Sequence, residues 1–237
     1  MSTIKLDSIA IDCPDAEALS TFYGHLLDLP VKFDAVRVPD RDLEIWFQPV
    51  DDYLPPTWPT QERGQQIHLD YAVTDLSAGV ARAITLGATK ADVQPGDSWT
   101  VMLDPAGHPF CLFAQDTGLA DDTPRIASIV FDAPNESALA TFYAGLLHGE
   151  AEANDGWASV IAETPVTVGV QPVEGYLATT WPTQERGQQI HIDYHATDRA
   201  AEVARAETLG ATLVDVNESF TVMKDPAGHT FCICDIS

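Results

Sequence analysis

Basic residues are scarce in this chain. Lysine and arginine together number 12 among 237 residues, against 36 aspartates and glutamates, and the formal net charge is −24. A surface this negative repels both the phosphates of nucleic acids and the head groups of anionic lipids. We therefore expect no nucleic-acid partner and no membrane partner.

Cysteines are few, and long apolar runs are absent. No stretch approaches the 18 apolar residues of a membrane span, and the first residues show no basic segment followed by an apolar run. The four cysteines form neither a CxxC pair nor a spaced framework, which is typical of free thiols in a reducing compartment. They are Cys13, Cys111, Cys232 and Cys234. We expect a cytoplasmic protein.

The sequence does contain one stretch twice. Residues 58–71 read WPTQERGQQIHLDY and residues 181–194 read WPTQERGQQIHIDY, so thirteen of fourteen positions are identical at an offset of 123. Self-similarity at a fixed period indicates a duplicated structural unit. A small, acidic, proline-ended stretch separates the copies. We predict one domain over residues 1–117, a linker over 118–124 and a second domain over 125–237.

The two halves show the same order of expected elements. In the first half, alternation predicts strands, and amphipathic stretches behind Asp15 and Asp75 predict two helices. The expected strands cover residues 6–12, 31–38, 43–48, 65–73, 98–103 and 108–113. The second half repeats the order, with helices capped at Asn135 and ended by Gly210. Each half is therefore predicted to contain a strand, a helix and further strands, followed by the same order of elements a second time.

These paired βαβββ units, with HLDYAVTD at 68–75 and DPAGH at 104–108 and 225–229, resemble the vicinal oxygen chelate superfamily. That superfamily includes glyoxalase I, extradiol dioxygenases and bleomycin-resistance proteins. The resemblance implies an α+β fold of two tandem glyoxalase-like domains, each of two βαβββ units forming an open curved barrel. Because one such fold serves isomerases, oxygenases, lyases and plain binders, it does not fix the function.

The resemblance also implies a metal held by His, Glu or Gln on four strands, and the sequence departs from that set. The position on the first strand of each half is Ser8 or Ser128, and the closing strand has Cys111 or Cys232 where the enzymes usually carry Glu. Serine is a poor ligand at neutral pH, so we expect no metal cofactor. The alternative is a divalent metal such as zinc, because a thiolate makes the site soft.

The candidate binding residues that remain alternate along one strand of each half. Three polar residues spaced by two point to one face, opposite an apolar face. They are Gln66, His68 and Asp70 in the first half and Gln189, His191 and Asp193 in the second. Gln48 and Gln171 are the amide candidates on a neighbouring strand. The His and Asp of each half can be interpreted in two ways. They are either a hydrogen-bonded polar pair with a structural role inside the fold, or part of a ligand site, with His68 and Asp70, or His191 and Asp193, as catalytic candidates.

The second half is expected to hold the more open pocket. Gly169 stands where the first half has the bulky Trp46, and His195 adds an imidazole where the first half has Ala72. Ligand pockets need room and a few convergent polar groups. We therefore expect the ligand to contact Gln171, His191, Asp193 and His195.

Two functional classes remain open. One is a protein that binds a small molecule in a concave pocket without the usual metal ligands; the other is a metal-dependent or His-based enzyme acting on a small metabolite. The loop 58–64 is either a lid over the ligand or an arm between the halves. We expect a monomer with an internal pseudo-dimer, or a homodimer.

Overall fold

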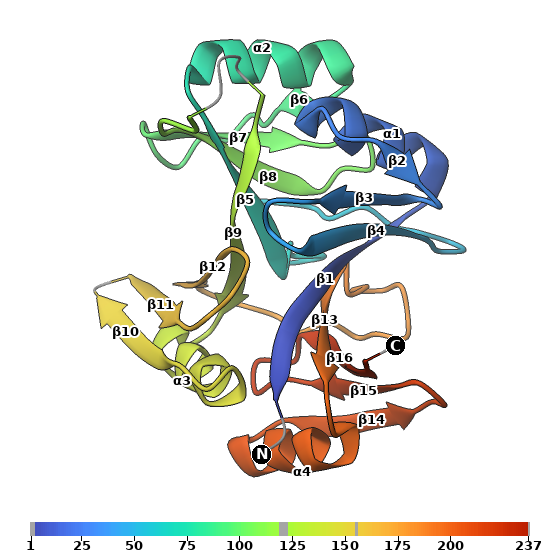
Figure 1. Cartoon of the computed structure of the whole chain (residues 1–237). Coiled ribbons are helices and arrows are strands. Elements are labelled where there is room, and N and C mark those ends of the chain that lie inside the picture. Colours follow the sequence, from blue (N-terminus) through green and yellow to red (C-terminus); the bar gives the residue numbers. More distant parts are fainter. Residues whose placement is uncertain (1–2, 119–122, 155, 237) are drawn as a thin grey trace.

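The computed structural model describes residues 3–118, 123–154 and 156–236 (Figure 1). The predicted linker 118–124 lies mostly outside the described residues. The first half contains β1 Ile4–Cys13, α1 Ala16–Leu27, β2 Val31–Lys32, β3 Ala35–Val38, β4 Leu43–Pro49, β5 Ile67–Val73, α2 Leu76–Leu86, β6 Thr89–Lys90, β7 Trp99–Leu103 and β8 Pro109–Ala114.

The second half repeats this order element by element. It contains β9 Arg125–Ala133, α3 Glu136–Leu146, β10 Glu150–Asn154, β11 Trp157–Ile161, β12 Thr167–Pro172, β13 Ile190–Ala196, α4 Arg199–Leu209, β14 Thr212–Val216, β15 Phe220–Lys224 and β16 Thr230–Asp235. Among the described residues, the expected strand 31–38 is a hairpin, because Phe33 and Asp34 adopt positive φ values of 51° and 56°. The edge strands β6, β10 and β14 were not expected.

The helix ends follow the predicted caps. Each of the four helices begins after a residue whose side-chain oxygen accepts a hydrogen bond from the backbone N–H three positions later. The predicted caps are Asp15, Asp75 and Asn135, and Asp198, which was not predicted, caps α4 in the same way. Gly87 and Gly210 end α2 and α4 at φ values of 114° and 112°, a conformation that glycine adopts without strain.

Two open, curved, mixed sheets are each built from both halves of the chain. Sheet A has the order β14-β15-β16-β13-β1-β4-β3-β2, and sheet B has the order β10-β11-β12-β9-β5-β8-β7-β6. The centre of sheet A is the antiparallel pair β1 and β13, and the centre of sheet B is the pair β5 and β9. Each sheet therefore joins one βαβββ unit of the first half to one unit of the second.

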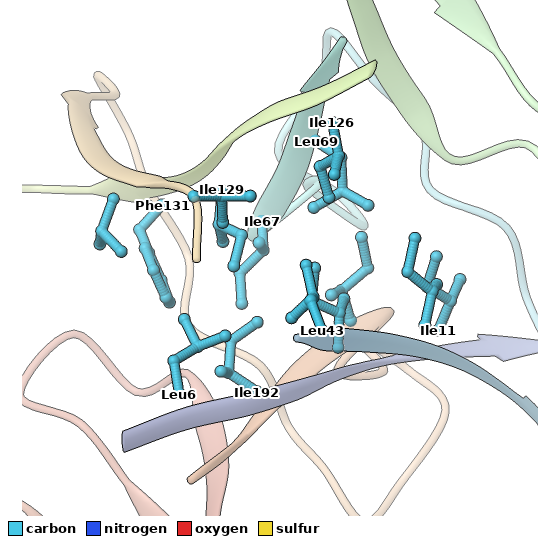
Figure 2. Close-up of a cluster of buried hydrophobic side chains, with 14 of the residues drawn as sticks. Leu6, Ile11, Leu43, Ile67, Leu69, Ile126, Ile129, Phe131 and Ile192 are labelled. Atoms are coloured by element: carbon cyan, nitrogen blue, oxygen red, sulfur yellow. The ribbon is translucent and has the colours of Figure 1, made fainter. Parts of the chain in front are cut away.

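One face of each sheet is apolar and buried. Figure 2 shows side chains of the central strands of both sheets meeting in one layer, among them Leu6 and Ile192 from sheet A and Ile67, Ile129 and Phe131 from sheet B. Helix α1 packs against β4, α3 against β10 and β11, and α2 and α4 near β8 and β16. The opposite face of each sheet, here called the open face, carries the polar residues of β5 and β13.

Two matching polar networks are buried inside the halves. In the first half, Asp104 accepts hydrogen bonds from the hydroxyl of Tyr23 at 3.0 Å and lies 2.9 Å from Nδ1 of His108. In the second half, Asp225 makes the same contacts with Tyr143 at 2.8 Å and His229 at 2.7 Å. These groups are buried and partnered, which is typical of a structural network.

No helix in the described part of the chain is long and apolar enough to cross a membrane.

Candidate functional site

The open face of sheet B is hollowed by a cavity of about 710 Å³. Its apolar lining combines aromatic rings with prolines and small aliphatic residues, and most of its polar lining lies on β5, the segment before it, β8 and β12. The aromatic residues are Trp58, Trp99, Phe113 and Trp157; the polar and thiol residues are Gln65, His68, Asp70, Ser98, Cys111 and Gln171. The strand β12 belongs to the second half, so the cavity needs both halves.

At this open face, His68, Asp70 and Cys111 bring an imidazole, a carboxylate and a thiol together. Their nearest ligand atoms all lie within 4.8 Å of one another, and Nε2 of His68 is 3.5 Å from Oδ1 of Asp70. His68 and Asp70 share a face because they are two positions apart on β5, and the parallel register of β5 and β8 places Asp70 opposite Cys111. The resemblance had placed Cys111 at a ligand position of the same site, and the alternation had placed His68 and Asp70 on one face.

Asp132, on β9 of the second half, lies behind the imidazole. Its Oδ1 is 3.9 Å from Nδ1 of His68, and it accepts hydrogen bonds from Nε2 of Gln65 at 3.0 and 2.9 Å and from Nε2 of Gln171 at 2.7 Å. Burial raises the pKa of Asp132 above its ordinary value, opposed by His68 and by the two glutamines. Asp132 therefore orients two amides that line the cavity.

The imidazole and the thiol influence each other. Burial lowers the pKa of His68, but the contacts with Asp70 and Cys111 outweigh it, so the pKa lies well above the usual value of 6.5. Burial raises the pKa of Cys111, and its hydrogen bond with His68 opposes the rise. Cys111 is therefore held mainly as the neutral thiol, which makes it a poor nucleophile in the absence of a metal.

Sheet A carries a second copy of the cluster. The ligand atoms of His191, Asp193 and Cys232 also lie within 4.8 Å, and Nε2 of His191 is 3.6 Å from Oδ1 of Asp193. Here the carboxylate accepts a hydrogen bond from the Ser8 hydroxyl at 3.1 Å, and Asp12 accepts from Gln188 at 3.2 and 3.0 Å. The pKa of Cys232 is raised by burial and by Asp193.

The expected grouping of one pocket within the second half is wrong. Gln171 lies on β12 of sheet B and bonds to Asp132, beside His68, whereas His191, Asp193 and His195 lie on β13 of sheet A. His195 points its Nδ1 to Asp7 at 3.1 Å. Gln48, on β4, is the amide in sheet A and is exposed. The reason is that each sheet joins one unit of each half. The glutamine on β4 or β12 therefore comes from one half, and the histidine on β13 or β5 comes from the other.

The inward direction expected for Gln66 and Gln189 is also wrong. Both residues precede their strands with positive φ values, 59° and 63°, and this breaks the alternation. The amide of Gln66 donates to the carbonyl of Leu177 at 2.9 Å, away from the cavity. The preceding residues, Gln65 and Gln188, take the inward place. The sequence did offer a signal for the aspartates that bond to Gln65 and Gln188. Asp12 and Asp132 lie four positions after Ser8 and Ser128 on the same strands, and therefore on the same face.

The empty space expected over Gly169 is filled. A Cβ on Gly169 would lie 2.3 Å from the ring of Trp157, which extends from the neighbouring strand β11. The indole N–H of Trp157 donates to Ser159 Oγ at 2.9 Å, so the ring is anchored there. Trp157 therefore occupies on sheet B the space that Trp46 occupies on sheet A, and glycine is what permits its approach.

The contacts described for the loop 58–64 bear on the lid, one of the two roles considered for it. Trp58 lines the cavity, as a lid residue would. Arg63 instead holds the loop itself, since its Nε donates to the carbonyl of Pro55 at 2.9 Å and its Nη1 lies 3.9 Å from Glu62. The arginine is not among the described residues that line the cavity.

The His68, Asp70 and Cys111 cluster fits a borderline-soft divalent ion. Nitrogen, oxygen and sulfur donors in one place are the set that zinc takes in proteins. The ligand atoms within 4.8 Å would need to close by about 1 Å to reach tetrahedral contact distances. Nδ1 of His68 is buried with no hydrogen-bond partner among the described residues. The cluster of His191, Asp193 and Cys232 offers the same donors.

Comparisons with known proteins agree with the fold. The sequence matches the family model described as a glyoxalase-like domain twice, over residues 8–113 and 128–234. No protein with a curated description matches it. The structure is similar to glyoxalase I from Zea mays (12% identity, TM-score 0.67, covering 99% of this chain and 93% of that one) and to a "putative dioxygenase" from Bacillus subtilis (12%, 0.62, 98% and 85%).

Identities this low establish the shared fold alone. The family match covers most of both halves, and the repeated element order agrees with it. The chain belongs to the glyoxalase-like domain family of the vicinal oxygen chelate superfamily, and it carries two copies of that domain.

Proposed function

We propose that the chain is a small-molecule-binding protein whose primary site is the cavity on the open face of sheet B. The observation that carries the proposal is the cavity itself: about 710 Å³, walled by aromatic rings, with an imidazole, a carboxylate and two amides converging in it. Small-molecule sites in proteins have this size range and this composition of apolar walls and few polar groups. The polar groups are held in place by Asp132, which supports a preorganised site.

Removing one aromatic wall tests the proposal. Trp99 on sheet B and Trp46 on sheet A both lie on open faces and are 38% and 39% exposed, so each can be replaced without opening the core. Native mass spectrometry and calorimetry against a small-molecule library would identify a ligand for the native protein. Trp99→Leu should then weaken its binding, and Trp46→Leu should leave it unchanged. Equal loss in both variants, or no ligand at all, would contradict the proposal.

A second candidate function, a metal-dependent enzyme, is favoured by the His68, Asp70 and Cys111 cluster. Zinc bound there would supply Lewis acidity to a substrate oxygen. The chain's own contribution would be to place Gln65 and Gln171 beside that oxygen and to exclude water with the indoles of Trp58 and Trp99.

Elemental analysis separates the two candidates. The missing Glu on the closing strands predicts less than stoichiometric zinc, nickel, iron, manganese or magnesium after mild purification. The matched variants are His68→Ala and His191→Ala. One ion per sheet, lost from the corresponding variant, would replace the first candidate with the second.

A further inference from the structure

We infer that the sheet B cavity selects organic cations with an apolar body over neutral and anionic molecules of the same shape. The inference rests on the proposed function and names the ligand class of that same site. Three independent features carry it: the absence of lysine and arginine among the described lining residues, fixed indole walls, and the carboxylate of Asp70 in the lining.

The cavity lining contains no lysine and no arginine among the described residues. Its charged groups are the carboxylate of Asp70 and the imidazole of His68, with the carboxylate of Asp132 directly behind. The whole chain adds a net charge of −24. An anion entering this space would meet no lysine or arginine side chain among the described lining residues. The lining group that can carry a positive charge is the imidazole of His68, which already faces two carboxylates.

The indoles present fixed surfaces to a cation. Trp157 lies over Gly169 and is anchored through Ser159, and the ring of Trp99 lies against Gly96, where a Cβ would be 2.3 Å from it. Neither ring can turn away without losing that packing. Cations bind the faces of aromatic rings, and tryptophan binds them best. A cavity that combines indole walls with a carboxylate is suited to a substituted ammonium group.

The strands of sheet A carry basic side chains. Lys224 there donates its Nζ to the carbonyl of Trp181 at 3.2 Å, and its counterpart in sheet B is Leu103. Arg37 lies on sheet A beside Glu44, at 2.9 Å. The acidic composition alone therefore does not keep basic residues off these sheets.

Three probes with one phenol body and different para groups test the inference by calorimetry. They are 4-(trimethylammonio)phenol, its uncharged carbon isostere 4-tert-butylphenol, and 4-hydroxybenzenesulfonate. We expect the cation to bind about tenfold more tightly than the tert-butyl compound, and the sulfonate to bind least. The preference should persist at high salt, where attraction to the diffuse net charge is screened.

The carboxylate is tested with a matched pair of variants. Asp70→Asn should remove most of the preference for the cation while leaving the affinity for 4-tert-butylphenol within about twofold. Glu207→Gln, on the exposed side of α4 against sheet A, removes one charge far from the cavity and should change nothing. The comparison of the probes on the native chain does not depend on either variant.

Each other outcome overturns the inference in a distinct way. Equal or tighter binding of 4-tert-butylphenol would leave the proposed binding function standing and remove its cation preference. Tightest binding of the sulfonate, present with added zinc and abolished by a chelator, would instead favour the metal site, because the ion reverses the local charge. Failure of all three probes to bind would contradict the inference, while the proposed function would still be decided by its own ligand screen.

Discussion

Nδ1 of His68 lies 3.9 Å from Oδ1 of Asp132, and the two residues come from different halves of the chain. The contact exists because β5 pairs with β9, so that a strand of the second half runs beside the strand that carries the histidine. Asp132 also accepts from Gln65 of the first half and Gln171 of the second. One carboxylate thus holds the polar groups of both halves in register.

Loss of that carboxylate should cost more than loss of its counterpart. Asp132→Ala leaves the amides of Gln65 and Gln171 without their acceptor, whereas Asp12→Ala removes the acceptor of Gln188 alone. A buried polar group left unpaired costs about 1–3 kcal/mol. We therefore expect the first variant to lower the free energy of unfolding by more than the second, measured by urea denaturation. Equal losses would show that the Gln171 contact contributes nothing.

The pKa of His229 gives a pH dependence with a definite sign. Burial lowers that pKa, but Asp225 at 2.7 Å outweighs it, so the folded value lies above the usual 6.5. A histidine with a raised pKa stabilises the fold fully below the unfolded pKa, and this contribution is lost as the pH rises through the folded pKa. The difference in unfolding free energy between the native chain and His229→Gln should therefore shrink as the pH rises above 6.5. A difference that grows with pH would contradict this assignment.

The approach of Trp157 to Gly169 predicts a compensating pair of substitutions. Gly169→Ala places a methyl group 2.3 Å from the indole, and overpacking of this kind costs about 1–3 kcal/mol. Trp157→Leu opens that space. We expect Gly169→Ala to cost clearly less in the Trp157→Leu background than in the native chain, as measured in a double-mutant cycle of unfolding free energies. Strictly additive effects would mean that the ring moves aside freely.

The exchange of strands predicts the behaviour of an isolated half. Residues 1–117 alone leave β1 without β13 and β5 without β9, so the central strands of both sheets expose their edges. Because the halves share one pattern, β1 of one copy can pair with β5 of another. We expect the fragment to form a homodimer or to aggregate, as determined by light scattering after size exclusion. A stable, soluble monomer would contradict the mutual dependence of the halves.

Local features of the fold were predictable from the sequence. The caps at Asp15, Asp75 and Asn135 and the glycine ends of α2 and α4 depend on residues next to the helix, so their chemistry is visible in the chain. The apolar faces of β5 and β13 follow from strict alternation. The superfamily followed from the repeated motifs, and the family match confirms it.

The site was predicted less well, because the interactions that build it are long-range and are not visible in the local sequence pattern. Which unit pairs with which is a long-range choice, and both choices bury the same apolar faces, so Gln171 was grouped with the wrong histidine. The positive φ of Gln66 shifts the phase of alternation by one residue. Trp157 fills the space over Gly169 from another strand, which a comparison of single aligned positions does not reveal.

Because each open face takes strands from both halves, the duplication provides no spare copy. A truncated gene product that kept one repeat would keep the His, Asp and Cys of that repeat but lose the residues that support them, since His68 would be separated from Asp132 and His191 from Ser8 and Asp12. Both repeats are therefore needed to complete either open face. A substitution in the lining of one repeat must also be compatible with the strand of the other repeat that pairs with it.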